Sequence, residues 1–166
     1  METFVWDVVF KAADKRAEKA AEEAAELLRA GKGKEALALM REVLAIAPEL
    51  PSAIKVLRAY IEEYPVDDSA VAILKEQAMR KSAGWVAQSA YASWLAMNGD
   101  HAGAEEALGL LMARFPNRLD FARGWMLNAA ECGKREEALA WLEAHRQKFG
   151  QFEYQSIKVQ LGKVGE

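Results

Sequence analysis

A single small residue recurs along this chain at a constant interval. Ala36, Ala70, Ala104 and Ala138 follow one another every 34 residues. A larger apolar residue stands four positions after each of them: Met40, Leu74, Leu108 and Leu142. A period of this length is typical of tandem helix pairs, in which one pair is repeated along the chain. The period therefore predicts an all-α chain made of four successive helix pairs.

Composition narrows the class of protein further. The 166 residues suffice for one domain with a substantial core. Alanine contributes much of the 52% hydrophobic content, so we expect helices that pack closely through small side chains. The net charge of −3 and the pI near 5.6 show no basic excess, and we therefore expect no nucleic-acid partner.

Turn residues divide the chain at the expected places. The first helix is predicted from about Ala12 to Ala30, where Gly31 and Gly33 break it. Its partner is predicted over 34–47, ended by Pro48 and Pro51. The third pair is predicted over 85–97 and from 101 to 115, with Asp100 as the cap of its second helix. The fourth begins at 119–132 and continues after Gly133.

The second pair departs from this pattern. Pro65 ends its first helix at Tyr64, because proline cannot continue a helix, and no glycine turn follows. Asp67 or Asp68 is then expected to cap the next helix. Gln77 stands where the first and third pairs have Val43 and Leu111.

The two ends of the chain carry apolar residues outside the pairs. In the C-terminal segment 153–166, Tyr154, Ile157 and Leu161 recur at helical spacing, although Ile157, Val159 and Leu161 also alternate as in a strand. We favour a C-terminal capping helix, because the last pair of a repeat array exposes an apolar face.

The N-terminal arm contains a dense apolar cluster around Phe4, Trp6 and Phe10. We favour an arm that covers the first helix pair. The alternative is that it docks onto a second copy of the chain, as a homodimer, or onto a membrane-bound partner.

The alanines and their larger partners resemble the tetratricopeptide repeat family. The small residue at the close contact between helices is Ala24, Ala92 and, more loosely, Met126, whereas Arg58 departs from the family pattern. The repeats are 17–50, 51–84, 85–118 and 119–152, between a first segment 1–16 and the tail. The resemblance implies an α-solenoid of antiparallel helix pairs wound as a right-handed superhelix.

In this family the first helices of the pairs line a concave groove that binds a protein segment. The resemblance implies a groove built from the residues Lys55, Ala59, Ser89, Ser93, Ala96, Arg123 and Leu127. The other groove-facing positions of the family map to Glu18, Ala21, Ala25 and Leu28 in the first repeat and to Ser52, Glu62, Val86, Asp120 and Ala130 in the later ones. Small side chains such as Ala59 and Ser93 suit an extended peptide or a helix that lies close to the backbone.

One subclass of the family clamps the acidic tails of heat-shock chaperones with several Lys, Arg and Asn side chains. Only Lys55 fits that set in this sequence. Ala59, Ala90, Asp120 and Gly124 occupy positions that the clamp fills with polar or basic residues, which argues against the subclass.

Residue types that carry chemistry are few. His101 is expected at a solvated turn and His145 in packing, and neither has metal-ligand spacing to other residues. Cys132, the single cysteine, is expected to be a buried or half-buried structural thiol. Gly31-Lys32-Gly33-Lys34 lacks the full phosphate-loop pattern and follows a helix where a strand is required. We expect no catalytic residues, no metal and no cofactor.

Tryptophan is enriched among the residues that dominate binding at protein interfaces. Trp125 and Trp141 fit core positions, whereas Trp85 and Trp94 are the expected surface aromatics.

The resulting functional expectation is an adaptor or scaffold that binds another protein. A dedicated chaperone or carrier for one subunit of a bacterial secretion or envelope assembly is the alternative, and an enzyme ranks third. We expect a cytoplasmic protein, because the start of the chain lacks secretory features and no stretch has the roughly 18 apolar residues of a membrane span.

Overall fold

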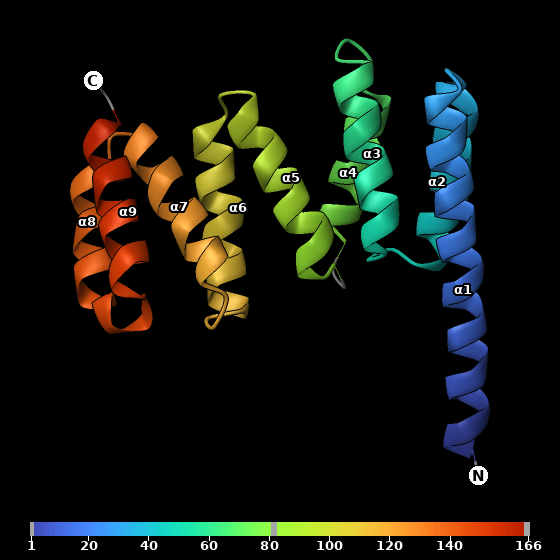
Figure 1. Cartoon of the computed structure of the whole chain (residues 1–166), viewed down its shortest axis with the longest axis horizontal. Helices are drawn as coiled ribbons and strands as arrows, with labels where there is room; N and C mark the ends of the chain where they lie inside the picture. Colours follow the sequence, from blue (N-terminus) through green and yellow to red (C-terminus); the bar gives the residue numbers. More distant parts are fainter. Residues whose placement is uncertain (1, 81–82, 165–166) are drawn as a thin grey trace. The chain divides into compact units, whose positions relative to one another are not determined.

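A computed structural model describes the backbone of residues 2–80 and 83–164, and the side chains of 14–80 and 83–164. Over these residues the chain forms nine α-helices, one 3₁₀ turn and no strand (Figure 1). The helices are α1 Glu2–Arg29, α2 Gly33–Ile46, α3 Pro51–Glu63, α4 Ser69–Ala78, α5 Trp85–Met97, α6 His101–Arg114, α7 Leu119–Glu131, α8 Arg135–Ala144 and α9 Gln151–Lys163, with η1 at Arg146–Lys148. The all-α prediction is confirmed.

Two helix boundaries differ from the prediction. Helix α1 begins at Glu2 rather than near Ala12, since no glycine or proline interrupts residues 2–29. Pro51 was expected to help end α2, but it is the first residue of α3. Proline is favoured there, because the first N–H of a helix has no partner within the helix.

Three of the turns inside helix pairs use glycine in the left-handed conformation. Gly31, Gly99 and Gly133 have φ of 75°, 80° and 80°. In each turn the residue after the glycine donates its N–H to a carbonyl five residues earlier, as Lys32 does to Leu27 at 2.9 Å. Asp100 and Lys134 make the same bond to Leu95 and Ala129. Glycine is needed because an L side chain disfavours this backbone conformation.

The turn inside the second pair contains proline instead of glycine. It resembles the proline turns that connect one pair to the next. Tyr64 precedes Pro65 and accepts the N–H of Asp67, three residues on, at 3.0 Å. Ala47-Pro48 and Phe115-Pro116 make the corresponding bond between pairs, with Leu50 and Arg118 as donors. Since proline cannot adopt positive φ, the glycine turn is not available at position 65.

Side chains hold this proline turn in place. The Tyr60 hydroxyl donates to Asp67 Oδ2 at 2.7 Å, and Oδ1 of Asp67 accepts the N–H of Ser69 at 2.9 Å. The expected capping role therefore belongs to Asp67, although Asp68 occupies the N-cap position. Gly33 leaves room for this arrangement, because a Cβ there would lie 2.9 Å from carbons of both Tyr60 and Tyr64.

The repeated alanines are buried, as the period predicts. Ala36 is 1% exposed, and Ala70, Ala104 and Ala138 are 0% exposed. The larger residues four positions later are buried as well. Asp100 also caps α6 as predicted, since its Oδ1 accepts the N–H of Gly103 at 2.9 Å.

The chain divides into two compact units, Met1–Ala90 (unit 1) and Tyr91–Glu166 (unit 2), with the division inside α5. Within unit 1, α1 packs against α2 and α3, and α4 packs against α2 and α3. The first helices of its two pairs are therefore neighbours, and so are the second helices.

Unit 2 has its core between α7, α8 and α9. Met126, Leu142 and Ile157, one from each helix, are fully buried in one apolar cluster. Trp125 and Trp141 pack against this cluster, as predicted. The tail is therefore helical rather than extended, and its apolar face covers the last helix pair.

Candidate functional site

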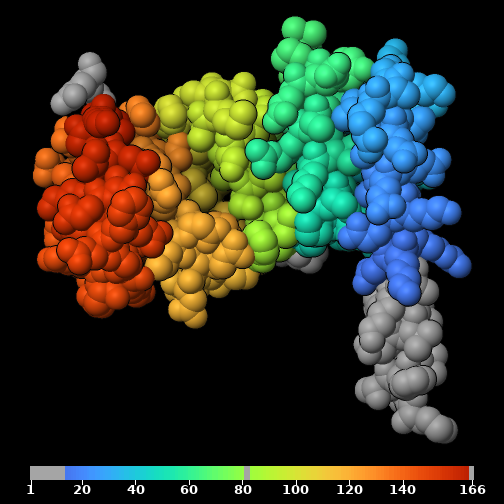
Figure 2. Space-filling model, in the orientation of Figure 1, coloured from blue at the N-terminus to red at the C-terminus, as the bar shows by residue number. Residues whose placement is uncertain are grey.

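The predicted binding residues of unit 1 lie on α3 and at the start of α5. Lys55 and Ala59 are both exposed, on a helix whose neighbour α1 lies beside it on the face shown in Figure 2. Ser52 of α3 donates to Glu18 Oε2 of α1 at 2.7 Å, so two of the mapped positions meet directly. The surface of these two helices is therefore small at Ala59, basic at Lys55 and acidic at Glu18.

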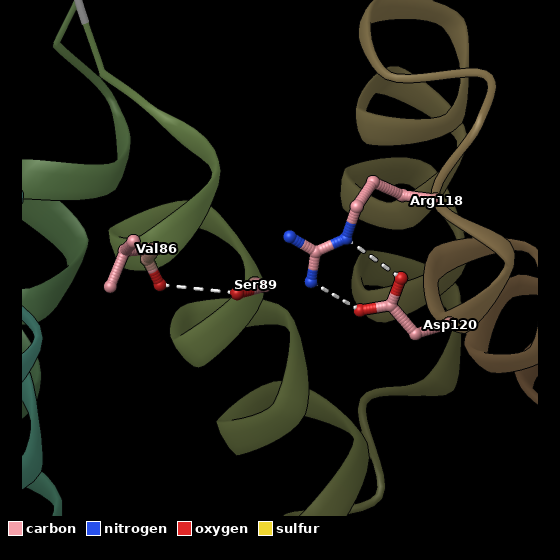
Figure 3. A network of polar contacts seen from close by, with 4 residues as sticks. All are labelled: Val86, Ser89, Arg118 and Asp120. Atoms are coloured by element: carbon pink, nitrogen blue, oxygen red, sulfur yellow. Dashed lines mark hydrogen bonds and ion pairs between the residues drawn. The ribbon is translucent and has the colours of Figure 1, made fainter.

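Ser89 is half-buried on the first part of α5. Its hydroxyl donates to the carbonyl oxygen of Val86 at 3.2 Å (Figure 3). A hydroxyl that is bonded within its own helix retains acceptor capacity for a partner.

In unit 2 the predicted residues have different surroundings. Ser93 is exposed, and Ala96 is half-buried. Leu127 is half-buried and packs against the core cluster of α7, α8 and α9. Arg123 donates to Gln160 Oε1 at 3.0 Å, which ties α7 to α9. This bond uses one of the five N–H donors of the Arg123 guanidinium group, so the others can still bind an incoming carboxylate.

Two mapped positions are not surface residues. Ala21 is 1% exposed and Ala130 is 5% exposed, so both belong to the core, contrary to the expectation from the family. Each lies on the side of its helix that faces a neighbouring helix rather than solvent. Fewer of the mapped groove positions are therefore accessible to a partner than the resemblance implies.

Arg118 and Asp120 form an ion pair that the sequence did not indicate (Figure 3). Arg118 Nε and one terminal nitrogen donate to the two carboxylate oxygens at 3.0 and 2.7 Å. This forked bond lowers the pKa of Asp120 and raises that of Arg118. Asp120, one of the mapped positions, is therefore already partnered by a cation.

The two histidines have partners within unit 2. His101 was expected to be solvated, but its Nδ1 lies 2.9 Å from Asn128 Oδ1. Since the Asn128 amide nitrogen donates to the carbonyl of Gly124, its oxygen faces His101, and Nδ1 carries the proton. His145 is a packing residue as predicted, with its ring stacked 4.0 Å from that of Trp141.

Cys132 is exposed, contrary to the expected buried thiol. It lies at the C-cap of α7 next to Gly133, where the chain turns away from the core. Of the two tryptophans expected at the surface, Trp85 is exposed, at 37%, whereas Trp94 is half-buried and stacked on Tyr91.

The side chains of Phe4, Trp6 and Phe10 lie outside the described ones, so both interpretations of the N-terminal arm stay predictions. Among the described residues, no group of three or more His, Cys, Asp and Glu side chains is arranged to hold a metal ion. None of the described helices is long and apolar enough to span a bilayer.

No protein-family model, curated protein or solved structure matches the chain. The resemblance to tetratricopeptide repeats therefore depends on the residues and helix packing described above.

Proposed function

We propose that the chain is a tetratricopeptide-like α-solenoid that acts as an adaptor or scaffold and binds a segment of another protein along its first helices. The observation that carries the proposal is the helix packing of unit 1. There α1 packs against α3, and α2 against α4, so first and second helices form separate layers. Layers of this kind are how tandem helix pairs build an extended binding surface.

Small exposed side chains on first helices, one in each unit, support a peptide or helix as the ligand. Ala59 and Ser93 are exposed and small, so a partner backbone can approach closely. Lys55 is exposed, and no described residue pairs with it, which leaves its charge available for an acidic side chain of the partner. An adaptor needs no more chemistry than this.

Affinity capture with the full chain as bait tests the proposal. Ala59→Arg and Ser93→Arg should each release the captured protein, because arginine adds bulk and charge at an exposed helix position with little intrinsic cost to the helix. Ala38→Arg is the matched control, since Ala38 is also exposed but lies on the second helix α2. Circular dichroism melts establish that all three variants fold.

Retention by the control together with loss by both first-helix variants supports the adaptor. The proposal fails if folded Ala59→Arg and Ser93→Arg retain the partner, or if Ala38→Arg loses it equally. Charge reversal at Lys55 should weaken an acidic partner more at low salt than at high salt, because ions screen exposed charges. Capture of a secretion or envelope subunit as the single partner would favour the dedicated carrier.

A further inference from the structure

One residue breaks the apolar pattern of the second helices. Gln77 occupies the position of Val43 and Leu111, which are 2% and 0% exposed. It is itself only 8% exposed. An amide in the place of a buried aliphatic side chain is costly unless its polar atoms are bonded. Hydrogen-bond partners for the amide atoms of Gln77 are therefore expected nearby.

Only half of the Gln77 amide has a partner among the described residues. Its Oε1 accepts a hydrogen bond from an Arg80 terminal nitrogen at 2.9 Å. Because Arg80 is a donor, the oxygen of Gln77 must face it, and the NH₂ group points elsewhere. No described residue accepts from this NH₂ group. The NH₂ nitrogen is not one of the fully buried atoms that lack a hydrogen bond, so it reaches solvent and is open to a ligand.

Gln77 lines a cleft between α2 and α4 of unit 1, which pack against each other. The cleft has a volume of about 250 Å³. Its walls are Arg41 and Ala45 from α2, Ile73, Glu76 and Gln77 from α4, and Arg80 from the segment that follows α4. A space of this size accommodates one side chain or a small organic molecule.

The charges around the cleft favour a single negative charge. Arg41 and Arg80 are exposed cations at its edge, and Glu76 is the one carboxylate in its wall. Within the described residues neither Arg41 nor Glu76 forms an ion pair. The lining therefore has one net positive charge, which a carboxylate neutralises. Glu76 would repel a phosphate dianion more strongly.

We propose that this cleft binds a carboxylate, with the guanidinium groups of Arg41 and Arg80 and the NH₂ group of Gln77 as its donors. Guanidinium groups bind carboxylates through paired hydrogen bonds. Ala45 and Ile73 supply apolar lining for the methylene next to the ligand's carboxylate. The ligand is a side chain or C-terminus of a peptide, or a free small carboxylate. The site uses second helices, so it is independent of the proposed first-helix surface.

Titration of the full chain with two probes tests the site. The first is N-acetylglycinate, with neutral N-acetylglycinamide as its control. The second is a capped hexapeptide with one glutamate, with its glutamine counterpart as control. The Gln77 side-chain NH₂ and Arg80 Nε signals, followed by nuclear magnetic resonance at constant ionic strength, should shift saturably with a dissociation constant of about 1 mM or tighter. Neither neutral control should shift them.

Three variants separate the site from general electrostatics. Gln77→Leu restores the residue type of the third pair, so it should fold with undiminished stability and bind the carboxylate at least about tenfold more weakly. Arg41→Gln with Arg80→Gln should abolish saturable binding. Lys75→Gln, an exposed charge on α4 outside the cleft, should leave the affinity within about twofold.

Several results would overturn the proposal. They are the absence of saturable shifts with both probes, undiminished binding by folded Gln77→Leu, and equal weakening by Lys75→Gln and the double arginine variant. Tighter binding of inorganic phosphate than of N-acetylglycinate would overturn the carboxylate assignment. If the site holds, tighter binding of the peptide identifies a protein ligand, and equal affinities identify a free carboxylate.

Discussion

The glycine turns make a quantitative prediction, because their geometry separates backbone strain from packing. Gly99 has φ of 80°, and a Cβ added there would meet no atom within 4 Å. Gly99→Ala should therefore cost only the left-handed strain of an L residue, about 1–2 kcal/mol. The lower entropy of alanine in the unfolded chain returns about 0.4–1 kcal/mol. The net loss is about 1 kcal/mol.

Gly150 supplies a matched control on the same chain. A Cβ there also meets nothing within 4 Å, but its φ is −64°, which any residue adopts. Gly150→Ala should change stability by no more than about 0.5 kcal/mol, because the entropy gain offsets the poorer N-cap residue.

Urea unfolding followed by circular dichroism measures both variants. In a thermal melt, Gly99→Ala should lower the midpoint by about 2–4 °C, the shift expected for 1 kcal/mol in a chain of this size. Gly31→Ala and Gly133→Ala should behave alike, since their φ values are 75° and 80°. A Gly99→Ala midpoint equal to that of the parent, or an equal loss in Gly150→Ala, would refute the turn assignment.

Three further predictions concern the core, the proline turn and the arm. Ala104→Trp should destabilise by about 1–3 kcal/mol or more in a urea titration, because Ala104 is fully buried between helices; an unchanged midpoint would contradict the predicted register. Hydrogen bonds from Ser69 and Tyr60 lower the pKa of Asp67 from 3.8 to about 2, so the stabilisation they give is present above pH 3.8 and is lost as the pH falls through 2. Between these pH values Tyr60→Phe should therefore lose less stability than the parent. Equal losses in the two proteins would show that the bond to Tyr60 does not contribute. The bond to Asp67 also raises the pKa of Tyr60 to about 12, so its stabilising effect should persist below pH 10 and disappear as pH rises through 12. Deletion of residues 1–11 should lower the melting temperature or the mass in solution, and no change in either would leave the apolar arm without the predicted roles.

Many helix ends could be predicted from the residues of a single turn. Gly99 followed by Asp100 specifies both the end of α5 and the start of α6, through a left-handed residue and a side-chain cap. The same logic failed at Pro51, because proline ends one helix and begins the next equally well. A proline alone does not say which side of it is helical.

Exposure and pairing were harder to predict, because they depend on residues distant in sequence. His101 precedes Asn128 by 27 residues, and only the packing of α6 against α7 brings the two together. Ala21 and Ala59 are both alanines at mapped groove positions, yet Ala21 is buried and Ala59 is exposed. The orientation of each helix decides this difference, and the repeat pattern alone does not specify it.

At Gln77 the sequence departs from the repeat pattern, and this departure pointed to the cleft. The sequence revealed the exception, since Val43 and Leu111 occupy the corresponding positions. It did not reveal that Arg80 bonds the amide oxygen or that Arg41 lines the same cleft from another helix. The packing of α2 against α4 was needed to bring Arg41 to the cleft that Gln77 lines.

Methyl nuclear magnetic resonance on alanine-labelled protein tests the central claim most directly, namely that first helices carry the binding surface. Ala59 of α3 and Ala96 of α5 represent that surface, and the exposed residues Ala38 of α2 and Ala140 of α8 represent the second helices. On addition of the captured partner, the methyl signals of Ala59 and Ala96 should shift or broaden, while those of Ala38 and Ala140 stay unchanged. Shifts confined to Ala38 and Ala140 would contradict the account.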